Sequence, residues 1–143
     1  MNYLSASMRS LLQKLCAKKL LPIIWTIITI VLLCLPGSSI PGDGIVFNIP
    51  NFDKIVHVIL FGGIVLLWGA HYVFRPEKLQ GWQKLIILLA ILSTALGIVL
   101  EYVQFYFIPQ RSFDKYDIVA DASGAIAAMF LVLFLSPRQT VKG

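Results

Sequence analysis

Residues 85–108 read LIILLAILSTALGIVLEYVQFYFI, and no charged residue interrupts them before Glu101. A transmembrane helix needs about 20 mostly apolar residues, so this stretch predicts one. Its apolar residues follow one another without the alternation that barrel strands require. The rest of the chain agrees, because 58% of its 143 residues are hydrophobic and only 13% are charged. This composition excludes an ordinary soluble domain and a disordered chain, and it predicts an all-α membrane protein.

Three further apolar stretches accompany this one, at residues 20–35, 55–74 and 117–136. Together the four stretches predict a domain of four transmembrane helices over residues 20–137. Residues 20–35 are interpreted as an uncleaved span, because no small-residue cleavage site follows them. Residues 1–19 then form either a basic cytoplasmic tail or a short helix lying on the membrane surface, and residues 138–143 form a second cytoplasmic tail.

Lysines and arginines are distributed unevenly between the two predicted sides of the membrane. Nine of the 12 lie in the two tails and in the segment between 55–74 and 85–108, whereas only Lys54, Arg111 and Lys115 lie on the opposite side. Basic residues accumulate on the cytoplasmic side, so both termini are expected in the cytoplasm. The net charge of +5 therefore reflects topology. No nucleic-acid-binding motif is present, and no nucleic-acid partner is expected.

Most of the unusual polar residues of the spans gather at their predicted outer ends. Within each span these residues are three or four positions apart, so they share one helix face. A charged side chain at the bilayer centre costs about 2.5–3.5 kcal/mol, and a partner or a wet cavity relieves that cost. We therefore expect one polar pocket, built from three helices and one loop. Its candidate ligand-binding residues are Asp53, Lys54, His57, Glu101, Gln104, Arg111, Asp114, Asp117 and Asp121.

Small residues form rows at helical spacing in the last two spans. Ala120, Gly124 and Ala128 are four residues apart, and Ser93 and Gly97 repeat the pattern in the third span. Such rows let helices approach closely in lipid. Gly124 is accordingly predicted to be a packing glycine and not a ligand contact.

Taken together, these motifs resemble the VanZ-like membrane proteins. The resemblance rests on Asp53-Lys54-x-x-His57, Glu101-x-x-Gln104 and Arg111-x-x-Asp114-x-x-Asp117-x-x-x-Asp121-x-x-Gly124, and it covers half of the chain. It implies a small multi-pass protein of the bacterial cytoplasmic (inner) membrane that belongs to the cell envelope. The family often has asparagine where this chain has Asp121, which adds one negative charge here.

The family's namesake is associated with resistance to glycopeptide antibiotics of the teicoplanin type. The resemblance therefore implies a link to antibiotic resistance. It also implies membrane lipids, a cell-wall precursor or a glycopeptide as partners.

The basic residues of the cluster predict binding of an anionic lipid or cell-wall precursor headgroup at the outer face. Its phosphate or carboxylate would be held by Arg111, Lys54, Lys115 and a protonated His57. The planar guanidinium of arginine suits such a group because it binds bidentately. The acidic residues would orient these cations. This interpretation needs no catalysis.

Three alternatives remain open from the sequence. In a metal-dependent membrane enzyme acting on a headgroup phosphate, a divalent ion would be held by His57, Glu101, Asp117 and Asp121. In a transporter, the buried charges would mark an ion pathway, but the inner halves of the spans are poor in polar residues. In a purely structural network, pairs such as Arg111–Asp117 or Lys54–Glu101 would satisfy one another without a ligand. No established catalytic motif is present, so the sequence assigns no catalytic residue and no cofactor, and it does not define an oligomeric state.

Overall fold

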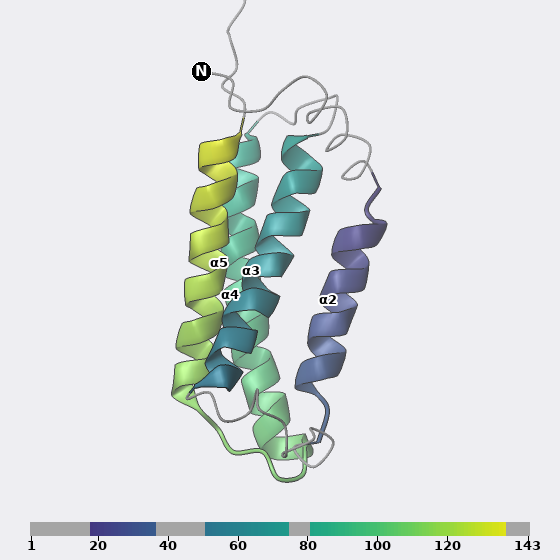
Figure 1. Cartoon of the computed structure of the whole chain (residues 1–143), viewed down its shortest axis with the longest axis vertical. Coiled ribbons are helices and arrows are strands. Elements are labelled where there is room, and N and C mark those ends of the chain that lie inside the picture. The colour runs from purple at the N-terminus through teal and green to yellow at the C-terminus, as the bar shows by residue number, and fades with distance from the viewer. Residues whose placement is uncertain (1–17, 37–50, 75–80, 137–143) are drawn as a thin grey trace, which may run out of the picture.

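The computed structural model describes residues 18–36, 51–74 and 81–136, and these form four helices. They are α2 (Leu20–Leu33), α3 (Phe52–Val73), α4 (Trp82–Phe107) and α5 (Lys115–Leu135). Figure 1 shows them side by side with their long axes nearly aligned. The all-α prediction is thus confirmed for these residues. Residues 1–17 of the predicted tail 1–19, and the whole predicted tail 138–143, lie outside the described residues.

Three of the helices, α3, α4 and α5, are long and apolar enough to cross a membrane. α2 has 14 residues, or about 21 Å at ~1.5 Å per residue, which is shorter than the ~30 Å hydrocarbon core. The structure therefore supports three of the four predicted spans. The fourth span stays a prediction, because the described helix is shorter than stretch 20–35.

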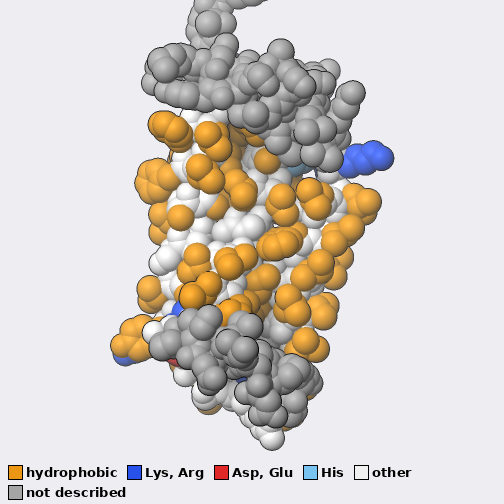
Figure 2. Space-filling view, viewed as in Figure 1, with side chains coloured by type: hydrophobic (Ala, Val, Ile, Leu, Met, Phe, Trp, Pro, Cys, Tyr) orange, Lys and Arg blue, Asp and Glu red, His pale blue; other side chains and the backbone are white. Residues whose placement is uncertain are grey.

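The outer surface of the helices is apolar, as expected for a protein surrounded by lipid. Many large side chains that would be buried in a soluble protein are exposed, among them Ile91 at 60%, Phe130 at 63% and Phe134 at 72%. Figure 2 shows hydrophobic side chains over the middle of the visible face, with the visible charges near its two ends. An apolar surface this continuous marks contact with a membrane or a partner, since soluble monomers expose only small apolar patches.

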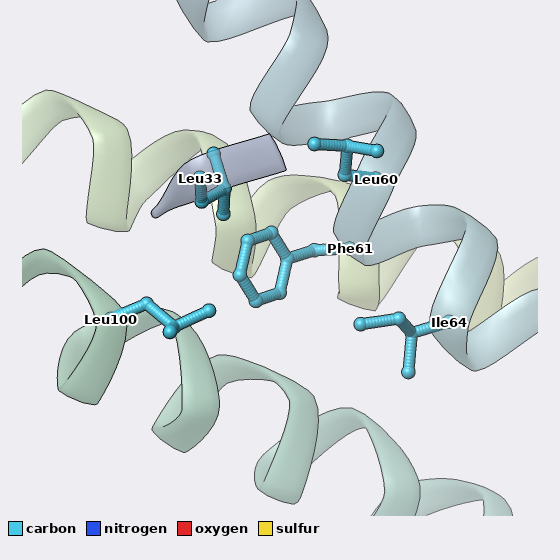
Figure 3. Packing of buried hydrophobic residues seen from close by; sticks show 5 residues of the cluster. All are labelled: Leu33, Leu60, Phe61, Ile64 and Leu100. Atoms are coloured by element: carbon cyan, nitrogen blue, oxygen red, sulfur yellow. The ribbon is translucent and has the colours of Figure 1, made fainter. Parts of the chain in front are cut away.

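α3 is the central helix of the arrangement. It packs most extensively against α5, and it also contacts α4 and α2. Near the α2 side, Phe61 is fully buried among residues of three helices (Figure 3). The other members of this cluster are Leu33, Leu60, Ile64 and Leu100.

α2 is attached to the other helices by three side-chain hydrogen bonds. Trp25 Nε1 donates to the Leu60 carbonyl at 3.0 Å, and Trp68 Nε1 donates to Thr26 Oγ1 at 3.1 Å. Gln104 Nε2 donates to the carbonyl of Leu33 at 2.7 Å, close to the C-terminal end of α2. These bonds fix α2 against α3 and α4.

Candidate functional site

The polar residues predicted from the sequence lie at one end of the helices, the lower end in Figure 1. α3 and α5 begin there, whereas α4 ends there, because each long helix runs opposite to the next one along the chain. The loop between α4 and α5 crosses the same end. Side chains four or more residues inside these helix ends can therefore meet between them.

Lys54 lies at the centre of three aspartates. Its Nζ atom donates to Asp53 Oδ2 at 3.0 Å, to Asp114 Oδ2 at 2.7 Å and to Asp117 Oδ1 at 3.1 Å. Asp114 also caps α5, because its Oδ1 accepts the backbone N–H of Tyr116 at 2.8 Å. The Lys54 ammonium and this backbone bond lower the pKa of the Asp114 carboxyl below its ordinary value. Lys54 thereby links the start of α3 to the start of α5.

His57 and Asp121 form a buried pair one turn deeper in the bundle. The His57 Nδ1 atom lies 2.8 Å from Asp121 Oδ1, and the two residues are 3% and 1% exposed. On the other side of the ring, Nε2 lies 3.9 Å from Asp117 Oδ2, so the pair adjoins the Lys54 cluster. A Cβ atom at Gly97 would collide with the carboxylate of Asp121. Gly97 of α4 therefore provides the space in which Asp121 faces His57.

Glu101 connects α4 to the loop that precedes α5. Its side chain is 2% exposed, and its Oε1 atom accepts the backbone N–H of Asp114. Its other oxygen, Oε2, is buried and has no hydrogen-bond partner within residues 18–36, 51–74 and 81–136. Glu101 thus holds the turn in place with one oxygen and leaves the other unused.

Two of the predicted site residues lie apart from these contacts. Gln104 donates to Leu33 and so serves the attachment of α2. Arg111 forms no ion pair with a described carboxylate, and its half-buried side chain has an Nε atom without a hydrogen-bond partner there. The structural pairs proposed from the sequence, Arg111–Asp117 and Lys54–Glu101, are therefore replaced by the Lys54 and His57 contacts.

The carboxylates that could hold a metal ion differ from the set predicted from the sequence. In the described part of the chain, oxygens of Asp53, Asp114 and Asp117 lie within 4.8 Å of one another. Of the four predicted ligands, only Asp117 belongs to this group. The Lys54 ammonium bonds all three carboxylates, so a divalent ion would have to displace it.

Sequence reasoning missed the role of Gly97. It was assigned to a packing row with Ser93, and the structure places it against a carboxylate. One signal was present, since Gly97 lies four residues before Glu101 and so shares its helix face. The packing role predicted for Gly124 is confirmed, because a Cβ atom there would strike the backbone of Val58 in α3.

Comparison with known proteins adds no relative. No protein-family model matches the chain, and neither a curated protein nor a solved structure matches it. The resemblance to the VanZ-like proteins therefore stays a prediction from the motifs.

Proposed function

We propose that this chain is a VanZ-like protein of the bacterial cell envelope that binds the phosphate of an anionic lipid or cell-wall precursor headgroup at the outer face of the cytoplasmic membrane. Arg111 is the residue that carries the proposal. It is the one arginine of the predicted outer side, and no described carboxylate pairs with it. The proposed link to glycopeptide resistance rests on the resemblance alone.

Two of the other predicted cations, Lys54 and His57, are already paired, which leaves Arg111 and Lys115, and only the arginine can bind a phosphate bidentately. Lys54 already donates to three carboxylates, and His57 is buried against Asp121. Neither can turn to an external anion without leaving acidic groups unpaired. Arg111 lies in the loop between α4 and α5, where a headgroup could approach it from the membrane surface. A guanidinium that pairs with no described carboxylate supports bidentate binding of a phosphate there.

Replacing Arg111 with alanine is expected to weaken binding of a phosphate-bearing lipid roughly 10–100-fold. The range corresponds to the ~1.5–3 kcal/mol of a hydrogen bond to a charged group. Arg111→Lys should restore binding only in part, because the ammonium lacks the bidentate geometry. The measurement is lipid co-purification and titration with the full chain in detergent, with thermal melting of each variant.

Lys115→Ala is the matched control for this substitution. It removes one positive charge four residues further on, from a side chain whose Nζ lies 5.4 Å from the Tyr116 ring centre. Equal losses in Arg111→Ala and Lys115→Ala would indicate attraction by charge in general, and would contradict a site at Arg111. Turnover of a lipid headgroup that stops when a chelator is added would instead establish the metal-enzyme alternative.

The proposed topology puts both chain termini in the cytoplasm and makes α2 the fourth span. A single cysteine introduced at Ser112, in a chain with Cys16 and Cys34 replaced by serine, should react with a membrane-impermeant thiol reagent added to intact cells. A single cysteine at Gln83, next to the opposite end of α4, should react only after the cells are opened. Both positions are exposed, so accessibility to the reagent is set by the membrane. The reverse labelling pattern would disprove the orientation.

A further inference from the structure

Two buried polar atoms near the turn between α4 and α5 are unsatisfied within the described part of the chain. They are Glu101 Oε2, which accepts hydrogen bonds when the carboxyl is ionised, and Arg111 Nε, which donates one. A buried polar atom without a partner is unfavourable, and more so if it is charged. In a native protein such an atom usually has a hydrogen-bond partner, and a bound ligand can be that partner. One of the two atoms is an acceptor, and the other is a donor.

The turn brings these two groups into the same neighbourhood. Asp114 donates its backbone N–H to Glu101, so the chain passes directly over this carboxylate. Arg111 precedes Asp114 by three residues, which limits the separation of their Cα atoms to about 10 Å. The arginine side chain can cover much of that distance. The two residues therefore lie at the same turn of the chain.

No described side chain supplies the missing charges. The Lys54 ammonium lies on three aspartates, and His57 bonds Asp121. No described cation lies within ion-pair distance of Glu101, and no described carboxylate lies within that distance of Arg111. A ligand that satisfies both residues therefore needs a negative group for Arg111 and a positively charged donor for Glu101.

We propose that the turn between α4 and α5 binds a phosphate ester that carries a primary ammonium group. Its phosphate oxygens accept hydrogen bonds from Arg111, and its ammonium donates to Glu101 Oε2. This inference rests on the proposed function only in the binding of a headgroup phosphate at Arg111. It adds an ammonium group to the ligand, so the headgroup is zwitterionic and the lipid needs no net negative charge. It also accounts for a carboxylate in a buried position where no described cation lies within ion-pair distance of it.

Aromatic side chains at the same turn favour a lipid as the source of this headgroup. Tyr102 lies 5.4 Å from Phe113 between ring centres, and Phe105 lies 4.8 Å from Tyr106. All four side chains are at least 40% exposed. Tyrosines and other aromatic rings gather where the acyl region meets the headgroups. The ligand would therefore reach the turn from the surrounding bilayer.

The test compares two lipids whose headgroups differ in the methylation of the amine, which removes its ability to donate. Phosphatidylethanolamine and phosphatidylcholine have the same phosphate and no net charge, but the choline nitrogen has no N–H. The full chain in detergent should bind the first about 10-fold more tightly, the equivalent of one hydrogen bond to a charged group. Arg111→Ala should weaken binding of both lipids by the same factor.

Glu101→Gln is the discriminating variant. It keeps an oxygen to accept the N–H of Asp114 and replaces Oε2 with a donor, so the preference for ethanolamine should fall to about 2-fold or less. Glu101→Asp, which keeps the charge, should retain part of the preference. Thermal melting of both variants close to wild type would show that the turn is intact. If Glu101→Gln melts early, the wild-type chain still decides the question, because equal affinity for the two lipids would overturn the ammonium site.

The outcomes separate this inference from the function on which it rests. An unchanged preference in Glu101→Gln, with Arg111→Ala still weakened, would overturn the ammonium site and leave phosphate binding in place. No effect of Arg111→Ala on either lipid would overturn the proposed function itself. Glycerophosphoethanolamine, the same headgroup without acyl chains, distinguishes the source. Its competition at equal concentration would assign the site to a soluble ester of this chemistry, and its failure to compete would assign it to the lipid.

Discussion

Asp121→Ala should destabilise the protein by about 3–5 kcal/mol, because removal of one partner from a buried pair leaves the other unsatisfied. The pair joins the two helices with the most extensive packing, and His57 has little access to water when its partner is lost. The measurement is equilibrium unfolding in detergent, followed by a probe of tertiary structure. Asp121→Asn should cost less than Asp121→Ala, since the amide oxygen can still accept from Nδ1, although it no longer neutralises a protonated ring.

The size of this loss also distinguishes a charged pair from a neutral hydrogen bond. Neutral hydrogen bonds between membrane helices contribute about 0.6 kcal/mol on average, well below the effect expected here. A double-mutant cycle with His57→Ala provides the control, because the two substitutions should be less than additive by about 0.5–3 kcal/mol. Strictly additive losses, or a loss near 0.6 kcal/mol for Asp121→Ala, would contradict a buried ion pair.

The three long helices could be predicted from hydropathy with errors of at most three residues at each end. α3 begins at Phe52, whereas the apolar stretch begins at residue 55. The missing turn contains Asp53 and Lys54, which hydropathy assigns to a loop although both belong to the helix. α2 was predicted too long for the opposite reason, since apolar residues continue after the last helical residue, Leu33. Hydropathy indicates which residues can lie in lipid, but it does not indicate where the helical hydrogen bonds end.

Most of the cluster followed from helix spacing, but the pairing within it did not. The i, i+4 spacing from Asp117 to Asp121 placed both side chains on one face, and both contact His57 in the structure. Gln104 is three residues from Glu101, which turns its side chain by about 60° around the helix and lets it reach α2. The pairing of Lys54 with Asp114 and Asp117 depends on the register of α3 and α5 along one another. That register is set by contacts between helices, so the spacing of residues along the sequence does not predict it.

The register of α3 and α5 depends on Gly124. The ideal Cβ position at this residue collides with the carbonyl oxygen of Val58 and lies 2.9 Å from its carbonyl carbon. A Cβ atom at Gly62 would lie 3.1 Å from the carbonyl oxygen of Gly124 itself. The two helices therefore touch backbone to backbone at this crossing. A side chain can rotate away from an added methyl group, but a helix backbone cannot.

Gly124→Ala is consequently expected to lower the free energy of unfolding by about 1–3 kcal/mol, the usual range for overpacking. Alanine favours the helix over glycine by about 0.8–1.0 kcal/mol, which offsets only part of the clash. Gly62→Ala should cost less, because its contact is longer. Ala127→Leu is the control: it adds a larger group to an exposed position of the same helix and should leave the melting temperature unchanged.

The position of Gly124 also predicts that its substitution acts on the polar cluster. Val58, which the new methyl group would push away, directly follows His57, and Gly124 follows Asp121 by three residues. Any separation of the helices at this crossing must therefore lengthen the 2.8 Å contact between His57 and Asp121. Because Gly124→Ala is expected to weaken this contact, Asp121→Ala should lower the free energy of unfolding by less in the Gly124→Ala variant than in the wild type. The same cost in both backgrounds would show that the crossing and the cluster are independent, whereas a reduced cost would show that close packing of the two backbones holds the pair together.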